Sequence, residues 1–259
     1  MKIKLQKNKH IGKVLFIVEG TKTEPYILKK IFTKIFDYQL DTKLRGKSYM
    51  QYNSKTDPYS RVFVINAQES NIKYIKKDDK YLDNLFLELI ENYGFDIDNA
   101  AIFYIYDRDD RSNTNSVFLK NMMTKLANSR DNYGNDRQGL LLLSYPSIES
   151  FTLSCFMDNT FSIEIETGKK LKTYLGSQSI NHQKIDELAL LHATTEMLTA
   201  LGYINKCKYD LDNFSKCNLD VFTYEENVKS VRGLYKCMSL FIICLIDLGL
   251  IELEFLIDK

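Results

Sequence analysis

Residues 13–25 read KVLFIVEGTKTEP, an apolar run that ends in an acidic, glycine-containing turn. A strand buried inside a parallel sheet reads as a continuous run of β-branched and aromatic residues, as residues 13–18 do. Pro25 suits the first turn of a following helix, where its missing N–H costs nothing, so we expect a helix over residues 23–36. The turn then brings Gly20 and free backbone N–H groups next to Glu19, in a place suited to a phosphate.

A second apolar run with a similar ending occupies residues 101–110, AIFYIYDRDD. Ligands of open α/β sheets bind just beyond the carboxyl ends of the strands, so the acids after both runs are expected to meet at one site. Crowded carboxylates repel one another unless a cation neutralises them, and hard oxygen ligands suit Mg²⁺ or Mn²⁺. The two motifs together favour a metal-dependent phosphoryl-transfer centre. Acids also follow strands in ordinary solvated turns, and that alternative stays open for either motif taken alone.

Composition sets wide limits on the class of protein. The chain has 259 residues, 44% of them hydrophobic, which is enough for a sizeable core in one domain or in one domain plus an appendage. The net charge is only +1, so no global field draws in nucleic acid. The basic amino terminus lacks the apolar stretch of a signal peptide, and the five cysteines include no C-x-x-C pair. We therefore expect reduced cysteines, a cytoplasmic protein and no membrane-spanning segment.

Strand and helix patterns alternate along the first part of the chain. Strands are expected over residues 13–18, 61–66, 101–106 and 139–144, and helices over residues 23–36, 82–90 and 116–127. This alternation predicts an α/β fold with a parallel sheet and helices on both faces. The later part reads mainly helical, with apolar stripes over residues 183–201 and 225–248 and a tail over residues 250–257 that fits a strand or a helix end. The predicted division is a domain over residues 1–160 and a mainly helical region over residues 161–259.

Two further segments have both a functional and a structural interpretation. Residues 41–60 mix tyrosines with cations such as Lys43, Arg45 and Lys47, as a loop that binds a nucleic-acid strand would, but a flexible surface loop has the same composition. Residues 144–151, SYPSIESF, follow the fourth strand and place Glu149 in the first turn of a helix. The helix dipole favours an acid there, and Glu149 also lies on the same rim as the other acids. Both interpretations stay open for each segment.

These three blocks, residues 19–25, 107–110 and 144–151, resemble in order and spacing the signature blocks of RloB-like proteins. That family belongs to the TOPRIM superfamily, which includes topoisomerases, bacterial primases and overcoming-lysogenization-defect (OLD) nucleases. The resemblance covers residues 13–156. Val18 stands where relatives often have Cys, and Tyr145 precedes Pro146 where Asn is usual, but neither change touches a carboxylate.

The resemblance implies a TOPRIM sheet in which Glu19, Asp107 and Asp109 hold Mg²⁺ or Mn²⁺. Glu19 is then also a general acid or base, and Lys22 steadies the charge of the transition state. The same resemblance implies three supporting acids, Glu24, Asp110 and Glu149. It also implies that Arg108 and Arg111 bind phosphates. Arginines beside acids commonly form ion pairs instead, and that alternative stays open.

In function, the resemblance implies a Mg²⁺-dependent endonuclease of bacterial antiviral defence that acts on DNA or RNA. Such proteins often work beside a separate ATPase, and this chain has no G-x-x-x-x-G-K-[ST] motif of its own. The apolar stripes of the later part fit packing on the sheet, docking to an ATPase, or pairing with a second copy. Two other classes remain as alternatives: a non-catalytic TOPRIM module that binds nucleic acid or a partner, and a nucleotide-sugar transferase with an Asp-x-Asp motif.

Overall fold

The computed structural model describes residues 1–41, 49–66, 87, 90–91, 100–108, 115–130, 139–205 and 214–254. Within these ranges the strands are β1 (Lys2–Leu5), β2 (Lys13–Val18), β3 (Tyr38–Leu40), β4 (Tyr49–Ser54), β5 (Arg61–Asn66), β6 (Ala100–Asp107), β7 (Ala127–Asn128), β8 (Gly139–Tyr145), β9 (Glu164–Ile165), β10 (Tyr235–Lys236), β11 (Met238–Ser239) and β12 (Ile251–Glu254). The α-helices are α1 (Thr23–Lys30), α4 (Ser116–Lys125), α5 (Glu149–Ser154), α6 (Gly168–Ser177), α7 (Glu187–Asn205), α8 (Phe214–Arg232) and α9 (Ile242–Asp247). Short turns of other helix types are η1 (Ile31–Ile35), η3 (Thr160–Ser162) and η4 (His182–Lys184).

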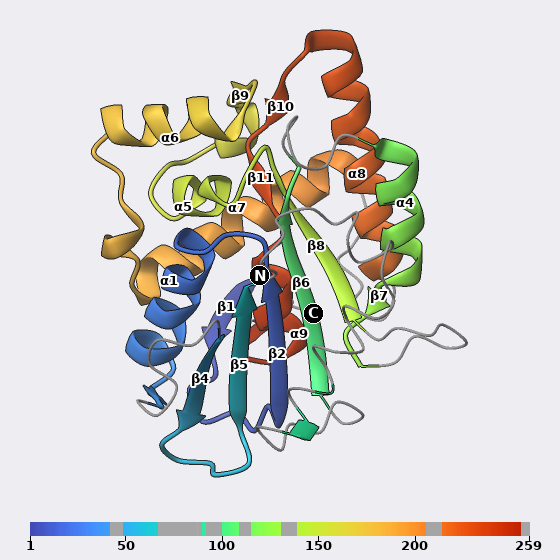
Figure 1. Cartoon of the computed structure of the whole chain (residues 1–259). Coiled ribbons are helices and arrows are strands. Elements are labelled where there is room, and N and C mark those ends of the chain that lie inside the picture. Colours follow the sequence, from blue (N-terminus) through green and yellow to red (C-terminus); the bar gives the residue numbers. More distant parts are fainter. Residues whose placement is uncertain are drawn as a thin grey trace, which may run out of the picture.

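Among the described residues the main sheet has the strand order β11-β8-β6-β2-β5-β4-β3, with β7 paired to β8 (Figure 1). The four predicted strands, β2, β5, β6 and β8, lie side by side and run parallel. They are almost wholly buried, as a strand with layers on both sides must be. The expected α/β class is confirmed, but the sheet is mixed, because β3, β4, β7 and β11 pair antiparallel.

One of these antiparallel strands lies where a loop was expected. Within residues 41–60, β4 pairs with β5 from Tyr49↔Ile65 to Asn53↔Arg61. Tyr52 on this strand is fully buried, and its ring stacks on Phe32 with centroids 6.2 Å apart. The tyrosines of this stretch therefore also belong to a strand and its packing, a role that composition did not reveal.

The part after residue 160 is mainly helical and also contributes to the sheet. Its strand β11 pairs with β8, and β12 pairs with β1, so the tail over residues 250–257 is a strand where it is described. The stripe predicted over residues 225–248 is not one helix, because α8 ends at Arg232 and two short strands follow before α9. The division at residue 160 remains a prediction, since the two predicted regions share one sheet.

The helices α5 and α6 lie beyond the carboxyl ends of the parallel strands, and α9 lies behind the sheet in the view of Figure 1. One large apolar core joins the sheet to α1, α4, α7, α8 and α9. A smaller cluster of Leu153, Leu171, Leu175 and Cys237 fixes α6 to α5. This packing holds α5 and α6 over the strand ends at which the predicted site residues lie.

Candidate functional site

Two acids predicted from separate motifs meet where β2 and β6 end. The parallel register pairs Val18 with Ile105, so Glu19 and Asp107 follow at nearly the same level of the sheet. The backbone N–H of Asp107 donates to Oε2 of Glu19 at 2.8 Å, and the N–H of Glu19 donates to the carbonyl of Ile105 at 3.2 Å. The strand ends themselves therefore bring the two carboxylates together.

A third acid, Glu24, comes from the first turn of α1. It is only 4% exposed, and its Oε1 accepts a hydrogen bond from the N–H of Gly20 at 3.0 Å. A Cβ built on Gly20 would lie 2.1 Å from Oε2 of Glu24, so only glycine leaves this carboxylate in place. Asn66, at the end of β5, fixes the same turn by donating to the carbonyls of Glu19 and Gly20 at 3.1 and 2.6 Å.

The fourth acid is Glu149, in the first turn of α5. Oδ1 of Asp107 accepts from the N–H of Ile148 at 2.7 Å, which ties the end of β6 to the start of this helix. Oε2 of Glu149 accepts from the hydroxyl of Ser147 at 2.7 Å, and Nζ of Lys172 lies 3.3 Å from its Oε1. We call Glu19, Glu24, Asp107 and Glu149 the acid cluster.

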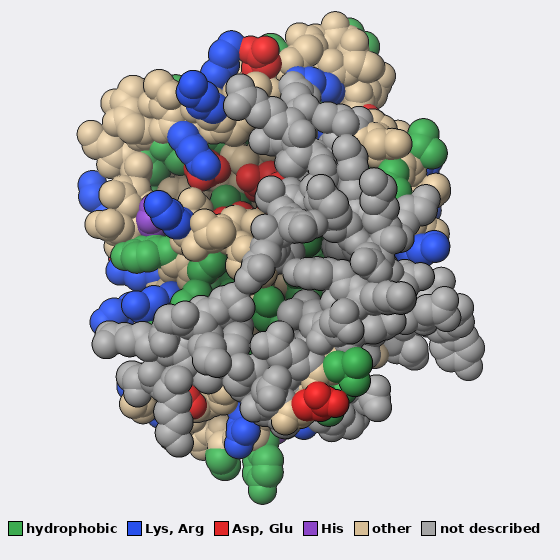
Figure 2. Space-filling model, in the orientation of Figure 1, with side chains coloured by type: hydrophobic (Ala, Val, Ile, Leu, Met, Phe, Trp, Pro, Cys, Tyr) green, Lys and Arg blue, Asp and Glu red, His purple; other side chains and the backbone are tan. Residues whose placement is uncertain are grey.

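The electrostatics of the acid cluster are unfavourable for four charged carboxylates. Burial, together with repulsion from Glu24, Glu19 and Glu149, raises the pKa of Asp107 well above its ordinary value. Burial and repulsion from Glu149 likewise raise the pKa of Glu24, although its backbone hydrogen bonds oppose the shift. Lys172 supplies one compensating charge, and its side chain is 61% exposed, so it lies at the mouth of the cluster. Figure 2 shows acidic side chains beside Lys or Arg side chains in the region where Figure 1 places α5 and α6.

Lys22, the lysine predicted to be catalytic, is exposed just before α1, where its carbonyl accepts from the N–H of Tyr26 at 3.0 Å. No described contact joins its side chain to the acid cluster. Within the described ranges, the lysine that reaches a cluster carboxylate is Lys172, which the sequence did not single out. It lies among several lysines of α6, and nothing in the pattern separates it from Lys169 or Lys170.

Several predicted site residues lie outside the described part of the chain. These are Asp109, Asp110 and Arg111 after β6, and Lys43, Arg45 and Lys47 before β4.

Arg108, predicted to bind a phosphate, is only 4% exposed. Its Nε and Nη2 donate to the two carboxylate oxygens of Glu226 on α8 at 2.8 and 2.9 Å. Nη2 also donates to the hydroxyl of Ser116 at 3.2 Å, and the guanidinium lies 5.9 Å from the ring centre of Tyr235. Arg108 therefore forms the ion pair of the alternative interpretation, and a phosphate contact from it stays a prediction.

The residues of the acid cluster suit a hard divalent cation. All four side chains offer carboxylate oxygens, three of them are almost fully buried, and their mutual repulsion falls when a cation lies among them. No family model, curated protein or solved structure matches the chain. None of the helices within the described ranges is long and apolar enough to cross a membrane.

Proposed function

We propose that the chain is a metal-dependent nuclease of TOPRIM type that hydrolyses phosphodiester bonds in DNA or RNA. The observation that supports this most directly is the convergence of the acid cluster from the ends of β2 and β6 and the first turns of α1 and α5, with the pKa of Asp107 raised by burial and by its acidic neighbours. Solvated turns do not bury carboxylates against one another, because the desolvation is costly without a compensating cation.

In this proposal Glu19 and Asp107 hold the cation, with Asp109 as a further ligand and Glu24, Asp110 and Glu149 in support. A bound Mg²⁺ or Mn²⁺ would polarise a phosphodiester oxygen and lower the pKa of a bound water. Glu19 and Asp107 each accept a backbone hydrogen bond, from the N–H of Asp107 and the N–H of Ile148, which fixes their positions. That rigidity favours precise geometry at the reacting phosphate.

The remaining residues of the site bind and orient the polyanion. The first turn of α1 presents backbone N–H groups beside Gly20, and a helix amino terminus favours a phosphate. Lys172 and the exposed Lys22 add positive charge beside the acids, where a transition state gains negative charge. Lys43, Arg45, Lys47 and Arg111 remain proposed contacts to flanking nucleotides.

Partners and cellular role belong to the same proposal. The resemblance to RloB-like proteins supports a cytoplasmic role in antiviral defence, and the lack of a phosphate-binding loop motif supports a separate ATPase. A homo-oligomer remains an alternative use of the later part of the chain. A non-catalytic nucleic-acid module and a nucleotide-sugar transferase remain the competing functions, and the experiment below separates all three.

The test is cleavage of plasmid DNA and of structured RNA by the purified chain with Mg²⁺ or Mn²⁺, with and without a candidate ATPase. Glu19→Gln is expected to lower the rate at least about a hundredfold, because it removes a metal-binding charge and a proton-transfer group. The amide oxygen can still accept from the N–H of Asp107, so the fold should persist. The matched control is Glu187→Gln, which changes an exposed glutamate paired with Lys7.

Full activity of Glu19→Gln with a parental melting temperature would overturn the assigned site. Nucleic-acid binding without cleavage in any of these mixtures would favour the non-catalytic module. Hydrolysis of a nucleoside-diphosphate sugar in place of nucleic acid would favour the transferase.

A further inference from the structure

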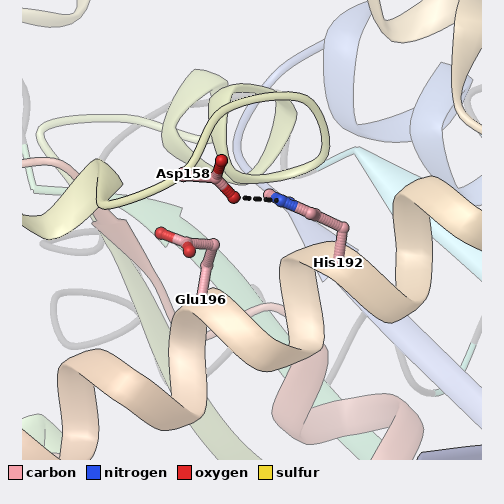
Figure 3. A group of neighbouring side chains, drawn as sticks. All are labelled: Asp158, His192 and Glu196. Carbon is pink, nitrogen blue, oxygen red and sulfur yellow. Dashed lines mark hydrogen bonds and ion pairs between the residues drawn. The ribbon is translucent and has the colours of Figure 1, made fainter.

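A second group of possible ligands lies on α7, apart from the acid cluster. His192 and Glu196 are four residues apart and project from the same side of the helix, and Asp158 faces them from the turn after α5 (Figure 3). One ligand atom from each of the three side chains lies within 4.8 Å of the other two. Two ligands that each lie about 2.1 Å from a metal ion are at most roughly 4 Å apart, so small side-chain movements would complete the geometry.

Contacts with the chain from Ser154 to Thr160 hold two of these side chains, His192 and Glu196, in place. Nδ1 of His192 lies 2.6 Å from the carbonyl oxygen of Ser154, the last residue of α5. Oε2 of Glu196 accepts from the N–H and the hydroxyl of Thr160 at 2.9 and 3.1 Å. Between these anchors Asn159 has a φ of 56°, which turns the chain so that Asp158 points back toward α7. The ligand set is therefore partly preorganised.

The two nitrogens of the His192 ring have different surroundings. The atom that Nδ1 faces is the carbonyl oxygen of Ser154, which can only accept, so Nδ1 must carry the proton of a neutral imidazole. The other nitrogen, Nε2, then has a lone pair, yet it lies 2.9 Å from a carboxylate oxygen of Asp158. A lone pair and a carboxylate repel each other unless a second proton or a metal ion lies between them. A hydrogen bond from Nδ1 to a backbone carbonyl is also the usual orientation of a metal-bound histidine.

We propose that Asp158, His192 and Glu196 form a binding site for a transition-metal ion, of which Zn²⁺ is the best match. One imidazole with two carboxylates suits Zn²⁺ better than Mg²⁺, which prefers oxygen ligands alone. Asp158 is 83% exposed, so an ion can enter from solvent and water can fill the remaining coordination position. The ion would connect the turn after α5 to α7, and α5 carries Glu149 of the acid cluster at its other end.

The experiment is calorimetric titration of the full chain with Zn²⁺ in excess Mg²⁺, which occupies hard-oxygen sites. One equivalent of Zn²⁺ is expected to bind. Asp158→Asn, His192→Gln and Glu196→Gln should each weaken Zn²⁺ binding at least about tenfold, because each removes a ligand atom or its charge. Asp158→Asn is the variant least able to disturb folding, because its side chain is exposed.

The matched control is His10→Gln. His10 also faces a carboxylate, with Nδ1 2.5 Å from Oδ2 of Asp57, but it belongs to no group of three ligands among the described residues. Zn²⁺ affinity should be unchanged in this variant and also in Glu19→Gln, which separates the site from the acid cluster. The proposal is overturned if no Zn²⁺ binds in excess Mg²⁺, or if folded Asp158→Asn and His192→Gln bind Zn²⁺ as the parent does. The group would then be an imidazolium–carboxylate pair.

Discussion

Asp107 and Arg108 are neighbours at the end of β6, yet they lie in opposite electrostatic surroundings. The carboxylate of Asp107 lies among three other acids, and burial with their repulsion raises its pKa. The guanidinium of Arg108 is matched by Glu226, Ser116 and the ring of Tyr235. Successive side chains of an extended strand point to opposite sides, so one residue step separates the two environments. Among the described residues, the Arg108 side therefore matches a cation to an acid, whereas the Asp107 side gathers four acids beside Lys172.

Removing the guanidinium of Arg108 should have the largest effect on the free energy of unfolding. Arg108→Ala leaves Glu226 without its cation in a largely buried place, and we expect a loss of about 3–5 kcal/mol in the free energy of unfolding. Urea denaturation measures it. The control is Arg232→Ala, because Arg232 is 58% exposed beside Glu164 and its loss should cost less than about 1 kcal/mol. Equal losses in the two variants would contradict the comparison.

Glu225, next to Glu226 on α8, is a buried acid whose Oε1 has no hydrogen-bond partner among the residues that the structure describes. Burial raises its pKa from 4.5 to about 8, although the N–H of Lys236 bonds to its other oxygen. Between these two values the folded chain keeps a proton that the unfolded chain has lost. The contribution of the Glu225 carboxyl to stability is complete below pH 4.5 and is lost as the pH rises through about 8.

We expect this glutamate to lower the free energy of unfolding by about 1.4 kcal/mol for each pH unit in that window. Glu225→Gln cannot ionise, so the difference in stability between parent and variant should shrink or change sign as pH rises. Denaturation curves at matched pH values check this. A difference that stays constant across the window would show that the carboxyl titrates normally.

The smallest expected effect is in the acid cluster. In chelator, Asp107→Asn should raise the free energy of unfolding by about 1 kcal/mol, because it removes one charge from four crowded carboxylates. The amide oxygen can still accept from the N–H of Ile148. The same variant should lose most of the stabilisation that Mg²⁺ gives the parent, which thermal melting with and without Mg²⁺ measures. If Asp107→Asn is less stable than the parent in chelator, Asp107 stabilises the fold rather than binding a metal ion.

The sequence predicted the parts of the site that depend on local pattern. Apolar runs ending in acids located β2 and β6, and the parallel register then brings Glu19 and Asp107 together. Arg108 shows where that reasoning stops, because its partner Glu226 lies on a helix more than a hundred positions later in the chain. Lys172 could not be identified for the same reason, since only tertiary packing of α6 on α5 brings it to Glu149. Antiparallel strands such as β4 and β11 were missed because tertiary pairing rather than local pattern defines them.

The pairing of β1 with β12 has a mechanical consequence. Lys2 lies opposite Glu254 and Leu5 opposite Ile251, so both outer ends of the described chain leave this two-stranded ribbon on the same side. A pulling force applied through those ends loads the hydrogen-bonded pairs one after another, as in a zipper, rather than all at once. The ribbon should therefore peel open at low force, while the parallel strands that carry Glu19 and Asp107 remain paired. An unfolding motor that grips either end would meet this weak ribbon first and the sheet with the acid cluster later.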